Sequence, residues 1–293
     1  MALRRRDKVQ IYKLSALLSL VRWYNIFFLA LAQYLAVIFI LNKVEDWLQL
    51  LLDPKVHYIV FASLFSVAAG YIINNFYDLE KDLINRPTKT FYEKILRQST
   101  TLKLYFLFIF ISLILASAVS LNVFLFFTVY NFSLWFYSHK LKKITFIGNM
   151  MAALLSITPF FAIFLYFRLE DLLILTYVSF LLLVILIREI IKDLEALKGD
   201  VIIGYPTLPV TLGIKRTKWL VAFFTLASLL PASLIFNKVG FNGIGYFLSV
   251  GLAGLFFSAG LLAFAEKREH FHYLNHLYRL LIIGGILSLV LIG

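Results

Sequence analysis

Residues 56–87 read VHYIVFASLFSVAAGYIINNFYDLEKDLINRP, an apolar run that ends in a cluster of acids and amides. The apolar part, residues 56–77, is long enough to cross a bilayer as a helix, which takes about 20 residues. Because a helix turns by about 100° per residue, the polar side chains at its end share one narrow face, and Glu80 points away from it. The residues of this face are Asn74, Asn75, Asp78, Asp82 and Asn85.

This polar face predicts a metal site. Carboxylates and amides at a membrane boundary are costly unless they bind something polar or cationic. Mg²⁺ suits them because it takes oxygen ligands, usually one or two carboxylates together with substrate phosphates and water. A solvated helix end is the alternative, and we expect Glu80, Lys81 and Glu93 to be solvated charges of that kind.

A second acidic cluster, residues 188–200, reads REIIKDLEALKGD and ends another apolar run. Three of its acids share one helical face: Glu189, Asp193 and Asp200. Glu195 lies nearly opposite, and Gly199 and Gly204 indicate that the helix ends or loosens near Asp200. Alone, this cluster could equally be a charged loop. Together with the first cluster, it favours metal-assisted handling of a diphosphate.

The composition predicts an all-α integral membrane protein with a single domain over residues 1–293. The chain is 61% hydrophobic and only 15% charged, with a mean hydropathy of +0.88, which is too apolar for the surface of a soluble domain. We expect a bundle of nine transmembrane helices after a basic leader at 1–14, with a tight hairpin at 120–122. The candidate spans are 15–41, 56–77, 102–119, 121–138, 146–167, 171–191, 219–236, 243–265 and 272–292.

The positive charges predict the orientation. Most of the 28 Lys and Arg residues fall in the leader and in the loops after the second, fourth, sixth and eighth spans. Those on the other side are Lys43, Lys55, Arg168 and Lys238. The positive-inside rule therefore places the N-terminus and both acidic clusters on the cytoplasmic side of the cell membrane. The net charge of +12 reflects this bias rather than nucleic-acid binding, and the absence of Cys excludes disulfides and thiolate metal sites.

On its two acidic motifs, the chain resembles the UbiA superfamily of intramembrane prenyltransferases along nearly its whole length. Members of that superfamily have nine spanning helices and two Asp-rich motifs on the cytoplasmic side. The first motif, N-D-x-x-D-x-x-x-D followed by N-R-P, matches residues 74–87, with Asn75 in place of the usual Asp. The second, D-x-x-D-x-x-x-D, matches Asp193 and Asp200, with Ala196 in place of the middle carboxylate.

Three further segments match the family in order. Arg22 and Asn25 correspond to its R-P-x-N signature, although Trp23 stands where Pro is usual. The other two segments are YSHKLKK at 137–143, followed by Gly148 and Asn149, and TLPVTLG at 207–213.

The resemblance implies Mg²⁺-dependent transfer of a prenyl group from an isoprenyl diphosphate, with the lipid bilayer as the enzyme's surroundings. It assigns metal binding to Asn74, Asn75, Asp78, Asp82, Asp193 and Asp200, the four Asp residues being catalytic. It assigns substrate binding to Arg22, Asn25, Arg86, Tyr137, Lys142, Asn149 and Lys192.

The acceptor is less constrained by the residues. The first motif looks closer to that of enzymes that alkylate the hydroxyl of geranylgeranylglyceryl phosphate than to that of enzymes that prenylate 4-hydroxybenzoate or dihydroxynaphthoate. A non-catalytic prenyl-lipid binder and a transporter are alternatives of other classes. Against a transporter, the acids lie at helix ends rather than near the bilayer midplane.

His272 and His276 lie one helical turn apart, with His270 just before them. Two histidines at this spacing can bind a metal. No neighbouring carboxylate is apparent in the sequence, so we expect packing or hydrogen bonding instead.

Overall fold

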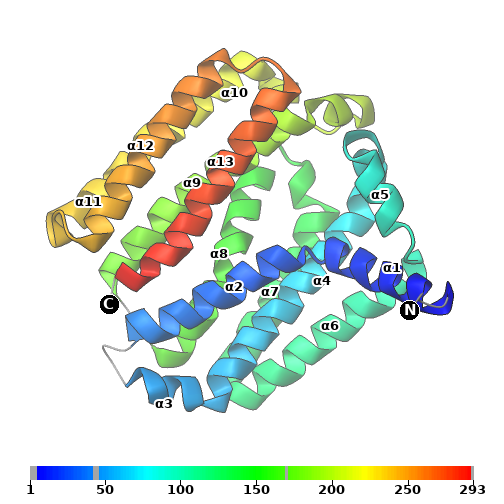
Figure 1. Ribbon diagram of the computed structural model, residues 1–293, viewed down its shortest axis with the longest axis horizontal. Helices are drawn as coiled ribbons and strands as arrows, with labels where there is room; N and C mark the ends of the chain where they lie inside the picture. The colour runs from blue at the N-terminus through cyan, green and yellow to red at the C-terminus, as the bar shows by residue number, and fades with distance from the viewer. Residues whose placement is uncertain (1–4, 42–45, 169–170, 292–293) are drawn as a thin grey trace. The chain divides into compact units, whose positions relative to one another are not determined.

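The computed structural model describes residues 5–41, 46–168 and 171–291, and these residues form helices without strands. They fall into two compact units, one with residues up to 30 and 54–139, and one with residues 31–53 and from 140 onward. The first unit contains α1 (Arg5–Leu20), most of α2 (Trp23–Leu35), α4 (Pro54–Asn85), α5 (Pro87–Glu93), α6 (Gln98–Val119) and α7 (Leu121–His139) (Figure 1).

The second unit begins with the end of α2 and contains the C-terminal half of the chain. Its long helices are α8 (Ile147–Phe167), α9 (Leu172–Ile203), α10 (Leu208–Ala227), α11 (Leu229–Val239), α12 (Gly243–Phe264) and α13 (Arg268–Leu287). Its short elements are η1 (Ala36–Ile40), α3 (Trp47–Leu52), η3 (Leu141–Lys143) and η4 (Ser288–Leu291).

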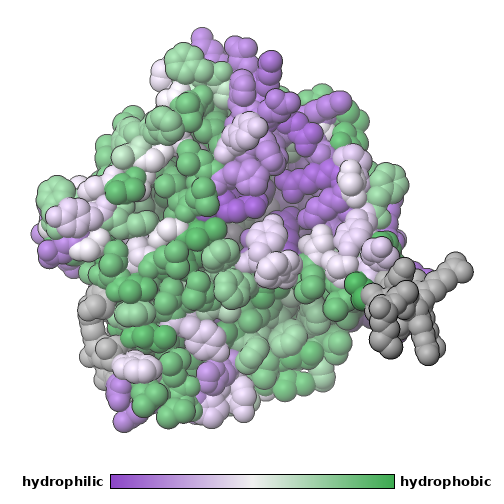
Figure 2. All heavy atoms as spheres, in the orientation of Figure 1, coloured by the Kyte–Doolittle hydropathy of each residue, from purple (hydrophilic) through white to green (hydrophobic). Residues whose placement is uncertain are grey.

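The predicted class, an all-α membrane protein, is confirmed. Within the described residues, 8 helical segments are long and apolar enough to span a bilayer. The prediction of nine spans therefore exceeds this count by one, α7, a helix of 19 residues whose Asn122, Asn131 and Ser138 reduce its hydropathy. Figure 2 shows hydrophobic side chains over much of the face that it presents, as expected where helices meet lipid.

The first predicted span, 15–41, is not one helix. It is broken at Arg22, which has a positive φ of 52° and separates α1 from α2. The backbone carbonyl of Arg22 accepts a hydrogen bond from the backbone N–H of Asn25 (2.8 Å), which forms the first turn of α2. A left-handed residue other than glycine is uncommon, and strain of this kind is found most often at functional sites.

Helix α4 is the centre of the first unit. It packs along α6 and α7 and contacts α5 and α1 (Figure 1). Buried hydroxyls join α4 to α6, since Ser66 and Ser112 are hydrogen-bonded at 2.7 Å. Gly70 lets α7 approach, because a Cβ there would lie 3.1 Å from Leu134.

The connection between α6 and α7 is the predicted tight hairpin. Helix α6 ends at Val119, and α7 begins at Leu121 after the single extended residue Ser120. The Ser120 hydroxyl accepts a hydrogen bond from the Val123 amide at 3.3 Å, which satisfies one of the donors at the start of α7.

Helix α9 is the centre of the second unit. It packs against α8, α10, α11 and α13. The Tyr177 hydroxyl donates to the Gly285 carbonyl at 2.8 Å, and the main core cluster of the unit lies around α9. Gly285 permits close contact of α13 with α9, because a Cβ there would lie 2.5 Å from Leu181.

The two central helices, α4 and α9, are alike in length and in burial. Each has 32 residues, and their most apolar windows are 56% and 61% buried, against 22–33% for the other spans. At a rise of 1.5 Å per residue, each is roughly 48 Å long and exceeds the hydrocarbon thickness of about 30 Å. Part of each helix therefore extends beyond the apolar layer, and the C-terminal parts of both carry the acidic motifs.

Candidate active site

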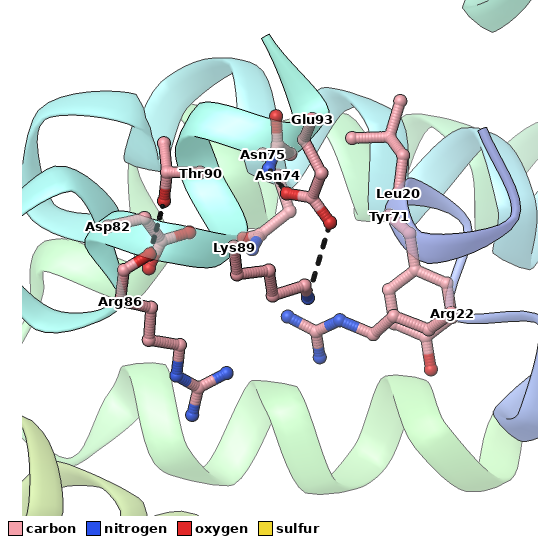
Figure 3. A pocket seen from close by; sticks show the side chains of 10 residues that line it. All are labelled: Leu20, Arg22, Tyr71, Asn74, Asn75, Asp82, Arg86, Lys89, Thr90 and Glu93. Atoms are coloured by element: carbon pink, nitrogen blue, oxygen red, sulfur yellow. Dashed lines mark hydrogen bonds and ion pairs between the residues drawn. The ribbon is translucent and has the colours of Figure 1, made fainter. Parts of the chain in front are cut away.

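The first motif lines a pocket at the C-terminal end of α4 (Figure 3). The pocket belongs entirely to the first unit, and its empty volume of about 340 Å³ includes open solvent. Its lining residues are Leu20, Arg22, Tyr71, Asn74, Asn75, Asp82, Arg86, Lys89, Thr90 and Glu93. The set combines oxygen donors with cationic side chains, which suits a ligand that carries both phosphate and metal.

Three of the five residues of the predicted face of α4 line the pocket, and Asn85 is buried outside the lining. Asn74, Asn75 and Asp82 line the pocket, whereas Glu80 is exposed, as expected. Asp78 is not part of the lining. It lies beside it and accepts a hydrogen bond from the Asn74 amide nitrogen at 2.8 Å. This contact holds the Asn74 side chain in place at the edge of the pocket.

The prediction that Glu93 is a solvated charge is wrong. Glu93 is only 7% exposed. Its carboxylate accepts hydrogen bonds from Ser19 Oγ (2.8 Å) and Asn75 Nδ2 (3.1 Å) and pairs with Lys89 Nζ (3.4 Å). The reason is the loop after α4: Pro87 begins α5 directly, and α5 turns Glu93 back onto α1 and α4.

Tyr71 organises the residues near the break between α1 and α2. Arg22 lies over its ring, 4.9 Å from the centroid, and the Asn25 amide donates to its hydroxyl at 2.9 Å. Arg22 and Asn25, both predicted substrate contacts, thus meet at Tyr71, and Arg22 lines the pocket. Tyr71 was missed by the sequence analysis, although it lies one turn before Asn75 on the same helical face.

Two more cations come from the segment after α4. Arg86 is the N-cap residue of α5, and its backbone carbonyl accepts a hydrogen bond from Thr90 Oγ1 at 3.0 Å. Lys89 is one turn before Glu93 and 38% exposed. Arg86 was predicted as a substrate contact and Lys89 was not, although a Lys–Glu pair at i, i+4 is visible in the sequence.

The residues of the pocket fit Mg²⁺. Among the described residues, no group of three or more His, Cys, Asp or Glu side chains is placed to hold a metal. A complete protein cage is therefore lacking in that part of the chain. A hard cation held by one or two carboxylates, with amide oxygens, phosphate oxygens and water completing the shell, matches the donors at the end of α4.

The second motif lies in the second unit, on the last turns of α9. Asp193 accepts a hydrogen bond from the Asn149 amide at 2.8 Å, so α8 positions this carboxylate. Asp200 is fully buried, and its carboxylate accepts from Thr207 Oγ1 at 3.1 Å, which supports the turn before α10. The two acids lie seven residues apart, about 10 Å along the helix, so they cannot bind one ion side by side.

The remaining predicted contacts differ in their surroundings. Lys192 is paired with Glu189 at 2.5 Å. Lys142 lies in η3, and α8 packs closely against it. A Cβ at Gly148 of α8 would lie only 2.9 Å from the Lys142 carbonyl oxygen. Tyr137, in the first unit, is half-buried near the end of α7.

The expectation that no carboxylate lies near the C-terminal histidines is wrong. Glu195, on the side of α9 away from Asp193, is 6% exposed and contacts α13. One of its oxygens lies 2.9 Å from His272 Nδ1, and the other accepts from the Asn275 amide at 2.7 Å. The predicted hydrogen-bonding role of the histidines is confirmed. Glu195 is thus committed to joining α9 and α13 and cannot replace the carboxylate missing at Ala196.

Comparison with known sequences gives one consistent family. The model of the UbiA prenyltransferase family matches residues 30–271. Digeranylgeranylglyceryl phosphate synthase of Thermococcus gammatolerans is 36% identical over 185 residues, which cover 62% of this chain and 65% of that relative, just under two thirds of its length. The synthase of the same name from Thermococcus kodakarensis is 29% identical, with 82% of this chain and 86% of the relative covered.

Solved structures share the fold. A structure of digeranylgeranylglyceryl phosphate synthase in membranes superposes with a TM-score of 0.71 at 21% identity, covering 95% of this chain and 97% of the other. A UbiA homologue from Archaeoglobus fulgidus, bound to GPP and Mg²⁺, superposes with a TM-score of 0.66 at 16% identity, covering 94% and 99%.

Proposed function

Because the chain belongs to the UbiA prenyltransferase family, as its motifs predict, we propose that it transfers a prenyl group from an isoprenyl diphosphate to an acceptor in the membrane. The observation that carries this proposal is the pocket at the end of α4, where amide and carboxylate oxygens of Asn74, Asn75 and Asp82 lie in one lining with Arg22, Arg86 and Lys89. A diphosphate with a bound divalent cation needs both kinds of group.

Each residue has a role in that reaction. Asn74, Asn75 and Asp82 would hold Mg²⁺, and Asp78 remains a predicted ligand whose carboxylate also keeps Asn74 oriented. Arg22 and Arg86 would contact the diphosphate by charge-assisted hydrogen bonds. When bound, Mg²⁺ supplies positive charge that neutralises the pyrophosphate leaving group as the allylic C–O bond breaks.

The other predicted ligands come from the second motif. We assign Asp193 the stronger role there, because Asn149 orients it and it is half-buried rather than enclosed. Asp200 remains a predicted ligand whose carboxylate also stabilises a turn. Lys142, Lys192 and Tyr137 remain predicted substrate contacts. Helices that span the bilayer would exclude water from the allylic cation.

The favoured acceptor is geranylgeranylglyceryl phosphate, which would be alkylated at its free hydroxyl with release of pyrophosphate and a proton. The relatives named digeranylgeranylglyceryl phosphate synthase support this choice. An aromatic quinone precursor is the competing acceptor within the same family.

The test is a competition assay with the purified protein in lipid nanodiscs. Geranylgeranyl diphosphate and Mg²⁺ are supplied with geranylgeranylglyceryl phosphate, 4-hydroxybenzoate and dihydroxynaphthoate together, and the products are identified by mass spectrometry. We expect the ether lipid, and no product after the metal is removed with EDTA. Prenylation of an aromatic acceptor without the ether lipid would overturn the acceptor, and the absence of any product would overturn the activity.

A further inference from the structure

Glu93 is a buried carboxylate in the wall of the α4 pocket, where Figure 3 shows it beside Lys89 and Asn75. With Ser19, three donors from three helices converge on it. Ser19 of α1 donates to Oε1 at 2.8 Å, and Lys89 of α5 pairs with the same oxygen at 3.4 Å. The amide nitrogen of Asn75, on α4, donates to Oε2 at 3.1 Å.

All three partners present donors to the Glu93 carboxylate. Lys89 is a donor only, and the Asn75 amide presents a donor toward the carboxylate. A buried charge is tolerated where such partners compensate for the lost hydration, and removal of one partner leaves the others unsatisfied.

The same contact decides the orientation of Asn75. Facing a carboxylate, the amide must turn its NH₂ group toward Glu93, which leaves its oxygen as the group that can bind a ligand in the pocket. An aspartate at this position would instead bring two carboxylates within about 3 Å, where like charges repel strongly.

We propose that Glu93 is a positioning residue of the active site: it directs the Asn75 oxygen toward the metal and holds Lys89 at the pocket wall as a diphosphate contact. The inference rests on the proposed function of the same pocket. Asn75 lacks the negative charge of the aspartate that is usual at this position. Glu93 of α5 supplies a carboxylate directly behind Asn75, so that the pair has one carboxylate and one hydrogen bond between its members.

The pair can be tested by exchanging its members. In Asn75→Asp the two carboxylates repel, and in Glu93→Gln the amide keeps one acceptor oxygen for Ser19 and Lys89 but turns its NH₂ group toward the NH₂ group of Asn75. The double variant restores one charge and one hydrogen bond, because Gln at 93 can donate to Asp at 75. Glu80→Gln, which changes an exposed carboxylate on the opposite side of α4, is the matched control.

Each full-length variant is measured in nanodiscs in two ways: the unfolding midpoint in EDTA, and the Mg²⁺ concentration that gives half of the stabilisation by inorganic pyrophosphate. We expect Glu93→Gln to need roughly 10–100-fold more Mg²⁺, as is typical when the partner of a metal ligand is removed. Asn75→Asp should also need more Mg²⁺, because repulsion from Glu93 turns the new carboxylate away from the metal. The double variant should recover at least half of the loss on a logarithmic scale, and Glu80→Gln should match the wild type.

Two outcomes would overturn the proposal. One is an Mg²⁺ requirement that stays unchanged in both single variants. The other is a double variant whose loss equals the sum of the single losses, since that shows no coupling between the two side chains. Because neither readout needs turnover, an inactive but pyrophosphate-binding wild type would refute the proposed function and leave this test intact.

Discussion

At the scale of single residues, the acids of the first motif differ in position and in role. Asp82 lines the pocket, Asp78 orients Asn74, and Glu80 is exposed to the surroundings. Net charge alone would treat the three acids alike. Their roles differ because a helix directs each side chain to its own sector.

Asp82→Ala should reduce the rate of prenyl transfer by about 10²-fold or more, as expected when electrostatic stabilisation of a transition state is lost. Glu80→Ala should change it little. The measurement is the initial rate with geranylgeranyl diphosphate at saturating acceptor, with circular dichroism to verify the helical content. Equal losses in the two variants would contradict the assignment of the pocket face.

Asn149→Leu should lower activity by roughly 10–100-fold, because Asp193 loses the amide that orients it. The loss should appear mainly as an increase in the Mg²⁺ concentration needed for the half-maximal rate. Ser156→Ala, on the same helix but with its hydroxyl bonded to the Ala152 carbonyl, serves as control. An unchanged Mg²⁺ requirement in Asn149→Leu would remove Asp193 from the metal site.

At the scale of helices, each unit depends on close contacts that small residues allow. Gly285 of α13 lies against Leu181 of α9, and Gly70 of α4 lies against Leu134 of α7. In a bilayer, helix association depends on packing and hydrogen bonds rather than on hydrophobic transfer, so these contacts contribute strongly.

Gly285→Ala should destabilise the protein by about 1–3 kcal/mol, since a Cβ there would lie 2.5 Å from Leu181. Gly260→Ala is the control, because no atom lies within 4 Å of the added Cβ, and we expect a neutral or slightly stabilising effect. Thermal unfolding in detergent measures both. A Gly285→Ala variant as stable as Gly260→Ala would show that α13 can move away from α9 at no cost.

At the scale of the whole molecule, the positive charges predict that the segments after both central helices lie on the cytoplasmic side. Single cysteines introduced at Lys94 and Lys198 in this cysteine-free chain should both react with a membrane-impermeant maleimide only in inside-out vesicles. A cysteine at Lys238 should react from the other side. Labelling of the first two positions from opposite sides would contradict a shared cytoplasmic location for the motifs.

The sequence by itself determined the membrane class, the hairpin at Ser120 and the shared face of Asn74, Asn75 and Asp82 in the first motif. These follow from local properties, namely hydropathy, turn residues and the helical period, which neighbours in the chain decide.

Only the tertiary structure decided the break at Arg22 and the partners of Glu93 and Glu195. Both glutamates appear in the sequence as surface charges in polar segments. Their burial depends on which helix packs against them, because a carboxylate becomes an interior group only where distant donors meet it: Ser19 and Asn75 at Glu93, and His272 and Asn275 at Glu195. The spacing of residues along the chain carries no information about such contacts.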